Sequence, residues 1–223
     1  MLRPMDGISI MELHAEAEAL TTGLAEGEAL DAQARALIAL ATAVSVTALD
    51  REAIGTAIGQ AMDSGASVAQ VQEIVALASG LGVHSLMVSA SAVLDAAALR
   101  GLVDPAAPFD SERQILWQKH VGDDPFWNGF SEELPGFLEA MLRLSPDIFA
   151  GFFDYCAIPW RSGTVRAKVK ELAALACDAA PSHRFRPGFR VHLKNAIKLG
   201  VGRTAIFQTL DIAAAAPEHR GSA

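Results

Sequence analysis

The sequence is poor in the residue types that build β-sheets. Aromatic residues make up 6% of its 223 residues, and Tyr occurs once. Strands favour aromatic and β-branched side chains, whereas Ala, the best helix former, occurs 42 times. This composition disfavours a β-sandwich or barrel and predicts an all-α protein.

The chain also lacks an excess of positive charge and has few cysteines. Its formal net charge of −8 disfavours a nucleic-acid-binding protein, which needs a basic face. Cys156 and Cys177 are too far apart for a CxxC redox pair and too few for a disulfide framework. Residues 1–18 carry no basic segment followed by an apolar one, which a secretory signal needs. We therefore expect a cytoplasmic protein.

One stretch is long and apolar enough to span a membrane and needs separate consideration. Residues 74–94 carry no formal charge, and about 20 apolar residues suffice to cross a bilayer. The stretch contains several Ser and Gly residues and one His, and its flanking residues are acidic, not basic. We interpret it as a buried helix followed by a second helix, and expect no membrane partner.

Helix-capping patterns divide the chain into short helices. Ser67–Gln70 and Ser111–Gln114 have the capping-box spacing, and Ser145 precedes a proline at a first helical position. Residues 104–108 contain two prolines and form the best linker. Three glycines are expected where helices end: Gly27, Gly65 and Gly200.

The two halves of the chain are related. A shift of 135 residues aligns Leu30–His84 with Val165–His219 without a gap, which indicates a duplication. Each copy is predicted to hold three helices, at 30–46, 52–64 and 68–80, and at 165–179, 188–199 and 203–215. The predicted domains are a degenerate, structural repeat (1–104), an aromatic-rich helical connector (105–163) and a repeat carrying the site (164–223).

The two copies differ in their ionisable residues. The second copy has Glu171, His183, Phe185 and His192 where the first has Ala36, Ala48, Asp50 and Ala57. Scaffolding repeats would spread polar residues more evenly. This asymmetry places the candidate site in the second copy.

His192 is the leading candidate in that copy. On a helix it shares a face with apolar residues, so it is either a core histidine with one hydrogen bond or a general acid/base whose pKa is tuned by burial or by a carboxylate. Glu171, on the preceding helix, could supply that carboxylate. Alternatively, Glu171 is exposed and pairs with Lys168.

A cluster of cations surrounds His192. Between His183 and Arg203 the chain has no acid and six basic residues: Arg184, Arg186, Arg190, Lys194, Lys198 and Arg203. Such a cluster is either a solvated helix face, a subunit contact, or a site for a carboxylate substrate, which Arg binds through two parallel hydrogen bonds.

Aromatic residues gather between the two copies. They are Phe126, Trp127, Phe130, Phe149, Phe152, Phe153, Tyr155 and Trp160. Aromatic residues at helical spacing usually form core; the alternatives are an apolar wall over the site or an oligomer interface. Residues 159–163 are predicted to form a loop, which would place Trp160 near the mouth of the pocket.

Two segments of the second copy resemble the carboxymuconolactone decarboxylase and alkylhydroperoxidase D superfamily. They are Val169–Asp178 (VKELAALACD) and Pro187–Gly200 (PGFRVHLKNAIKLG). The first copy resembles it more weakly, at Leu37–Ala41 and Ala61–Ile74. The resemblance implies an alkylhydroperoxidase D-like helical fold, with two tandem three-helix repeats packed as one unit and a homo-oligomer, either a trimer or a hexamer.

The resemblance also separates two chemistries. The peroxidase branch has a CxxC pair seven and four residues before the histidine, where this chain has Phe185 and Gly188. The decarboxylase branch has no such pair. For it, the resemblance implies a cofactor-independent lyase or isomerase, with neither metal nor organic cofactor, acting on a small carboxylated lactone or related acid.

In that reading His192 is the catalytic acid/base and Glu171 its partner. The anionic small-molecule substrate would be bound by Arg190, Arg186, His183 and Trp160. Two alternatives stay open. One is a non-catalytic, oligomeric ligand-binding homologue. The other is an antioxidant protein of the alkylhydroperoxidase type that uses Cys156 or Cys177.

Overall fold

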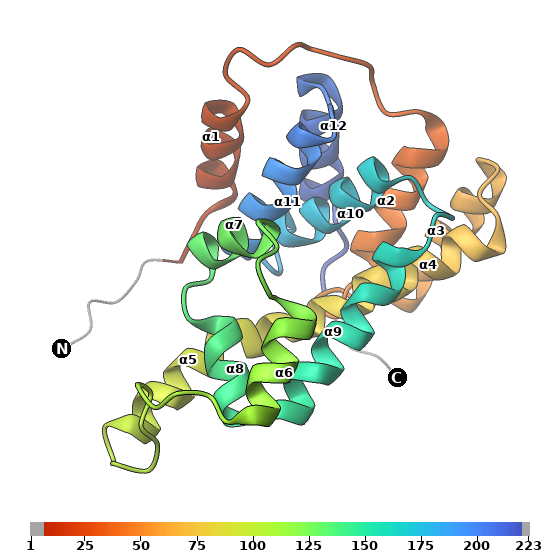
Figure 1. Ribbon diagram of the computed structural model, residues 1–223. Helices are drawn as coiled ribbons and strands as arrows, with labels where there is room; N and C mark the ends of the chain where they lie inside the picture. The colour runs from red at the N-terminus through yellow and green to blue at the C-terminus, as the bar shows by residue number, and fades with distance from the viewer. Residues whose placement is uncertain (1–6, 220–223) are drawn as a thin grey trace. The chain divides into compact units, whose positions relative to one another are not determined.

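A computed structural model describes residues 7–219, and this range is helical without any strand. The all-α prediction is therefore confirmed. Residues 1–6, the first part of the segment examined for a secretory signal, lie outside the described residues. The elements (Figure 1) are α1 (Ile10–Leu20), α2 (Ala32–Val44), α3 (Arg51–Asp63), α4 (Val68–Ser79), the 3₁₀-helix η1 (Gly80–Val83), α5 (His84–Ala98), α6 (Ser111–His120), α7 (Phe126–Glu133), α8 (Phe137–Leu144), α9 (Pro146–Arg161), α10 (Ala167–Ala179), α11 (Arg186–Lys198) and α12 (Arg203–Ala214).

The chain forms two compact units. One holds the described residues up to Leu81 and from Pro159 onward, and the other holds Gly82–Ile158. These boundaries differ from the predicted 1–104, 105–163 and 164–223. The linker at 104–108 does not separate the units, because α5, which precedes it, packs against α8, which follows it. Both repeats share the first unit.

The two repeats have the same helix boundaries. Helices α2, α3 and α4 begin and end 135 residues before α10, α11 and α12, and all six lie within two residues of the predicted ranges. Leu49 and Arg184, also 135 apart, both have a φ of 49°, which non-glycine residues seldom adopt. Shared backbone strain at matching positions supports the duplication independently of helix propensity.

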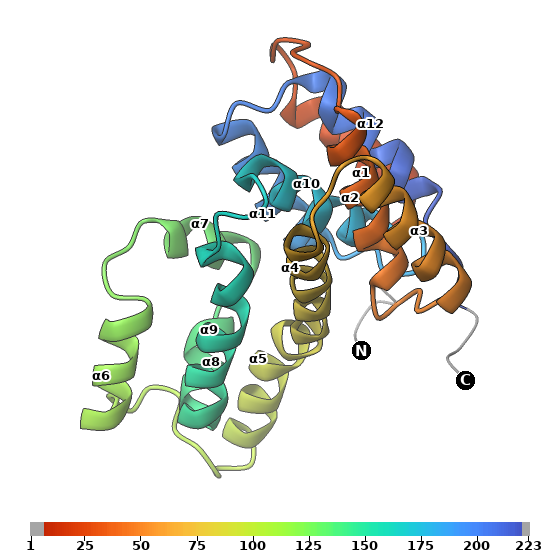
Figure 2. The same ribbon diagram turned by 90° about the vertical axis from the view of Figure 1, so that its right-hand side faces the viewer.

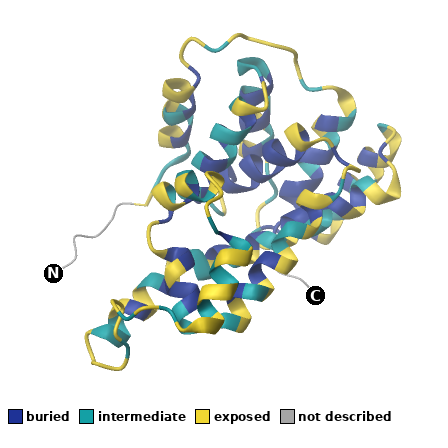
Figure 3. Cartoon of the chain, viewed as in Figure 1, coloured by how far each residue is buried: buried dark blue, intermediate teal, exposed yellow. Residues whose placement is uncertain are grey.

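The two repeats pack around a common core, and the third helix of each contacts the first helix of both repeats. Helix α2 packs against α10; α12 contacts α2, and α4 contacts α10 (Figures 1 and 2). One hydrophobic cluster draws on both repeats, including Leu37, Leu172 and Phe189. Every residue of α10 from Val169 to Ala179 is buried, as its continuous dark blue in Figure 3 shows. Ionisable residues on α10 are therefore forced into the interior.

The capping patterns are largely confirmed. Ser67 and Gln70 form the expected capping box of α4, and Ser145 Oγ accepts a hydrogen bond from the amide of Ile148 at 3.2 Å. Helix α6 begins at Ser111 as predicted, but its N-cap is Asp110, whose carboxylate accepts the bond from the amide of Arg113.

Two of the three glycine predictions are correct. Gly65 and Gly200 follow α3 and α11 with φ of 90° and 77°, values that glycine adopts without a steric penalty. Gly27 lies in the loop before α2 and does not end a helix. A β-carbon there would lie 2.7 Å from Gly202 Cα, so Gly27 permits two backbone segments to approach.

The uncharged stretch divides into two helices, α4 and α5, joined by η1, as predicted. Val68–Ala98 is long and apolar enough to cross a membrane by length and composition, and about a third of its most apolar window is buried. Length and composition are weak evidence for a span, because the core helix of a soluble protein has the same properties.

Aromatic residues form the core of the second compact unit. Phe149 and Phe153 pack edge-on at 4.9 Å between ring centroids, and Trp127 packs on Phe153 at 5.2 Å. Phe137 is buried beside Phe152. Core packing is therefore the outcome for most of this group. Three of the eight predicted aromatic residues differ: Phe126 and Tyr155 are nearly half exposed, and Trp160 belongs to the first unit.

Candidate active site

His192 and Glu171 meet between α10 and α11. His192 Nδ1 lies 2.7 Å from Glu171 Oε2, and Asn195 Nδ2 donates to the other carboxylate oxygen at 3.3 Å. Their side chains are 17% and 9% exposed, so Glu171 is not a surface partner of Lys168. Because Glu171 accepts the proton of Nδ1, the second nitrogen of the ring, Nε2, is the one available for chemistry.

The surroundings of His192 favour its protonated form. Burial alone would lower its pKa, but the hydrogen bond and charge of Glu171, together with the charge of Asp178, outweigh burial and raise the pKa above 6.5. The raised pKa favours the imidazolium, which is the form that can donate a proton to a substrate.

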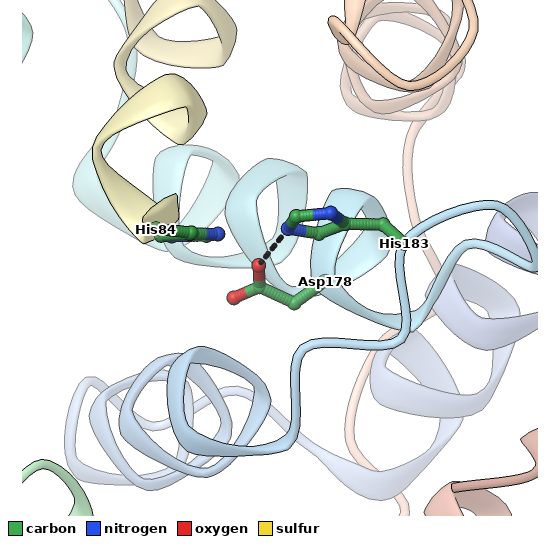
Figure 4. Close-up of side chains that lie close together, drawn as sticks. All are labelled: His84, Asp178 and His183. Atoms are coloured by element: carbon green, nitrogen blue, oxygen red, sulfur yellow. Dashed lines mark ion pairs between the residues drawn. The ribbon is translucent and has the colours of Figure 1, made fainter. Parts of the chain in front are cut away.

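A second carboxylate, Asp178, belongs to the same cluster and was not predicted. It is completely buried; its Oδ2 lies 3.9 Å from His192 Nε2, and its Oδ1 lies 3.6 Å from His183 Nε2 (Figure 4). Burial raises the pKa of Asp178 to about 7, against the opposing charge of His192. Burial lowers the pKa of His183.

Asp178 could have been identified from the sequence by comparing the two repeats. Its counterpart in the first repeat is Ala43, just as Ala36, Ala48 and Ala57 are the counterparts of the other ionisable residues. Four of the five positions at which an ionisable residue replaces Ala therefore lie in one cluster in the second repeat; the fifth, Asp211 in place of Ala76, is exposed on α12.

Gly188 makes room for this cluster. A β-carbon at Gly188 would lie 2.3 Å from Asp178 Oδ2, too close for any real side chain. Gly188 and Phe185 occupy the positions at which the peroxidase branch has its cysteines, and Phe185 donates its amide to the carbonyl of Asp178 at 2.9 Å. The space that a cysteine would need at Gly188 is filled by a carboxylate.

Trp160 stacks on the imidazole of His192. The ring centroids are 6.0 Å apart and the planes differ by 8°, while Trp160 stays 38% exposed. Trp160 was expected in a loop at 159–163, but α9 continues to Arg161 despite Pro159 in its last turn. The carbonyl of Pro159 is satisfied there by Lys170 Nζ at 2.7 Å.

A buried ion pair fixes the segment that carries Trp160. Lys170 Nζ donates to Glu73 Oε1 at 2.9 Å and to the carbonyl of Ser162 at 2.7 Å, and both ionic side chains are at most 5% exposed. Burial alone would raise the pKa of Glu73, but the hydrogen bonds from Ser162 and Lys170 lower it. These residues were not predicted, because a lone Lys and Glu carry no sequence signal of burial.

The cationic cluster is paired with acids near the N-terminus. Arg186 Nε lies 3.1 Å from Glu16 Oε2, and Arg190 pairs with the same carboxylate. Arg203 pairs with Glu18 of α1. Arg190 lies two residues, or about 200°, from His192 around α11, so the two side chains leave opposite faces of the helix. The structure brings His183 and Trp160 to His192 and holds Arg186 and Arg190 at α1.

The first repeat has a cavity where the second has its ionisable cluster. The cavity measures about 630 Å³ and is lined by α2, α3 and the segment after α12. Ala43 and Ala57, the counterparts of Asp178 and His192, are among its lining residues. Asp50, Glu52 and Glu218 also line the cavity, but the positions that hold Asp178 and His192 in the second repeat are alanines here.

Both cysteines are held in their thiol form. Burial raises the pKa of Cys156 to about 11 and raises that of the fully buried Cys177 further above its ordinary value. The thiolate is the reactive species of cysteine. The thiols therefore lack the activation that a peroxidatic cysteine requires.

Comparison with solved structures identifies the fold. A protein described as a putative gamma-carboxymuconolactone decarboxylase subunit, from Burkholderia xenovorans, superposes with a TM-score of 0.71 at 27% sequence identity, covering 92% of this chain and 77% of its own. The chain has a carboxymuconolactone decarboxylase-like fold. No family model and no curated protein matched the sequence.

The carboxymuconolactone decarboxylase-like fold agrees with the resemblance seen in the second repeat. The similarity extends over nearly the whole chain, whereas the residues that carried the resemblance cover about half of it. The chain therefore has the fold in both repeats, with the ionisable cluster only in the second.

Proposed function

We propose that this chain is a cofactor-independent lyase or isomerase that acts on a small carboxylated lactone or related acid by proton transfer at His192. The observation that carries the proposal is the 2.7 Å contact between His192 Nδ1 and Glu171 Oε2. The gamma-carboxymuconolactone decarboxylase-like neighbour supports a decarboxylation.

In this reaction His192 supplies the proton. When carbon dioxide leaves, the electron pair of the broken carbon–carbon bond stays on the substrate, and the imidazolium donates the Nε2 proton to that carbon. Glu171 keeps Nδ1 protonated and orients the ring. Trp160 forms an apolar wall at the imidazole, and His183 faces the same cluster through Asp178.

The anion-binding role proposed for Arg186 and Arg190 requires a displacement. Both guanidinium groups are paired with Glu16, so a substrate carboxylate would have to replace that side chain. Glu16→Gln tests this role, because it should lower the KM of an anionic substrate if the arginines bind it. An unchanged KM assigns both arginines to holding α1 against α11.

The decisive experiment uses gamma-carboxymuconolactone and measures the release of carbon dioxide. His192→Gln is expected to lower kcat by about 100-fold or more, the usual contribution of a general acid. His14→Gln on α1 is the matched control and should retain wild-type turnover. An inactive wild-type protein that still binds small carboxylic acids would contradict the proposal and favour the non-catalytic alternative.

We further propose a cytoplasmic homo-oligomer, a trimer or hexamer, with a small anionic molecule as its partner. Support for the assembly and for the anionic partner comes from the resemblance of the chain to its superfamily. Support for the cytoplasm comes from the two cysteines, which form neither a CxxC pair nor a disulfide framework. Analytical ultracentrifugation tests the assembly, and a monomer at micromolar concentration would refute it.

A further inference from the structure

His192 lies between two carboxylates, and the proposed reaction uses only one of them. Glu171 binds Nδ1, while Asp178 Oδ2 lies 3.9 Å from Nε2, the nitrogen that exchanges the proton. Glu171 and Asp178 are seven residues apart on α10, two helical turns, so both leave the same face of that helix. Helix α10 therefore presents one acid to each nitrogen of the ring.

The distance between Asp178 and Nε2 suits an exchange through a third atom. At 3.9 Å the two atoms are too far apart for a direct hydrogen bond, yet both can lie about 2.8 Å from one donor or acceptor placed beside them. Asp178 is also fixed in place, because the backbone of Gly188 packs against its carboxylate. The geometry leaves its oxygen facing the reactive nitrogen.

Other polar and charged groups of this compact unit lie around Asp178 and His192. His183 Nε2 approaches the other oxygen of Asp178 at 3.6 Å. On α10, the cation Lys170 is held by Glu73, and Asn195 of α11 binds Glu171. With its pKa raised to about 7, Asp178 can exchange a proton with an imidazole at little cost.

We propose that Asp178 is the proton partner of His192 at Nε2, a positioning residue for the acid/base reaction proposed above, on which this inference rests. In the exchange the N–H bond of the imidazolium breaks and an O–H bond forms on Asp178 Oδ2, so imidazolium and carboxylate become neutral imidazole and carboxylic acid. Recharging His192 after turnover requires a second proton. When Asp178 is already protonated, the imidazole left after His192 has protonated a substrate takes the O–H proton of Asp178, and a proton from solvent then restores the acid.

The first repeat provides an internal comparison. Ala43 and Ala57 line its cavity at the positions of Asp178 and His192. Both members of the proposed pair are absent together, while the helices that would carry them are retained. This joint absence is expected if the two side chains work as a unit.

NMR of histidine-labelled protein tests the pair without a substrate. The His192 signals are assigned by their loss in His192→Gln. In Asp178→Asn the pKa of His192 should fall by about one unit and the Nε2 shift should change. The matched control Asp211→Asn, which removes an exposed charge from α12, should leave both unchanged. A His192 titration in Asp178→Asn identical to that of the wild type would overturn the proposal.

A second NMR measurement uses the wild-type protein with labelled aspartate carboxyl carbons, so it does not require Asp178→Asn to fold. The Asp178 signal should respond at the pH at which His192 titrates, because the two groups share a proton. An Asp178 signal that follows only its own titration, with no step at the His192 pKa, would overturn the proposal even if Asp178→Asn did not fold.

Turnover separates this inference from the proposed reaction. Asp178→Asn should lower kcat by about 10-fold or more with an unchanged KM. Wild-type kcat in this variant would overturn the role of Asp178. If the wild-type protein releases no carbon dioxide from the lactone while the NMR coupling is present, the proposed reaction is refuted and the proton pair remains.

Discussion

Replacing Asp178 by Asn should change how the stability of the protein depends on pH. Complete burial raises the pKa of Asp178 from 3.8 to about 7. Between these values the native state holds a proton that the unfolded chain has lost, so stability falls as pH rises through this window. Each pH unit between the two pKa values corresponds to about 1.4 kcal/mol of unfolding free energy. The total loss of stability across the window is therefore at most about 4 kcal/mol.

Asn cannot ionise, and Asp178→Asn should lack this loss. Between pH 5 and the pKa of about 7, the wild type loses stability over about two pH units. From about pH 5 to pH 8, the unfolding free energy of Asp178→Asn should therefore rise by about 3 kcal/mol relative to that of the wild type. This shift does not depend on any constant effect of the substitution on packing.

Urea unfolding followed by circular dichroism, at several pH values in this range, measures the difference directly. Asp211→Asn, a charge change on the exposed side of α12, should differ from wild type by a nearly constant amount. Parallel stability curves for the wild type and Asp178→Asn would refute the argument, because they would mean that Asp178 is ionised to the same extent in the folded and unfolded states.

Three further predictions concern other parts of the first unit and the thiols. Lys170→Met should lower the unfolding free energy by about 3–5 kcal/mol in urea denaturation, because it leaves the buried Glu73 without its cation; a loss below about 1 kcal/mol would contradict this account. Gly188→Ala should lower it by about 1–3 kcal/mol, since its β-carbon would overlap the buried aspartate, whereas Gly59→Ala in α3, with open space around it, should be neutral or stabilising. Cys156 should react with a thiol reagent at neutral pH far more slowly in the native than in the unfolded protein, because burial raises its pKa to about 11; equal rates would favour the antioxidant alternative.

Local patterns in the sequence were sufficient to place the helices of the two repeats. Capping residues such as Ser67, turn glycines such as Gly200 and the spacing of apolar residues act over a few positions, so they can be identified without the fold. Comparison of the repeats then identified Glu171 and His192, because a duplicated chain contains its own reference. Their contact followed from two adjacent helices facing each other.

The sequence by itself therefore determined the helical class, the duplication and the repeat that carries the candidate site. Only the tertiary structure decided which side chains meet there. It buried Asp178 beside His192, stacked Trp160 on the imidazole and paired Arg186 and Arg190 with Glu16. These contacts join residues from separate helices, and Arg190 and Glu16 are 174 positions apart. Local propensity has no access to such contacts, because they depend on how the repeats and α1 pack around α10 and α11.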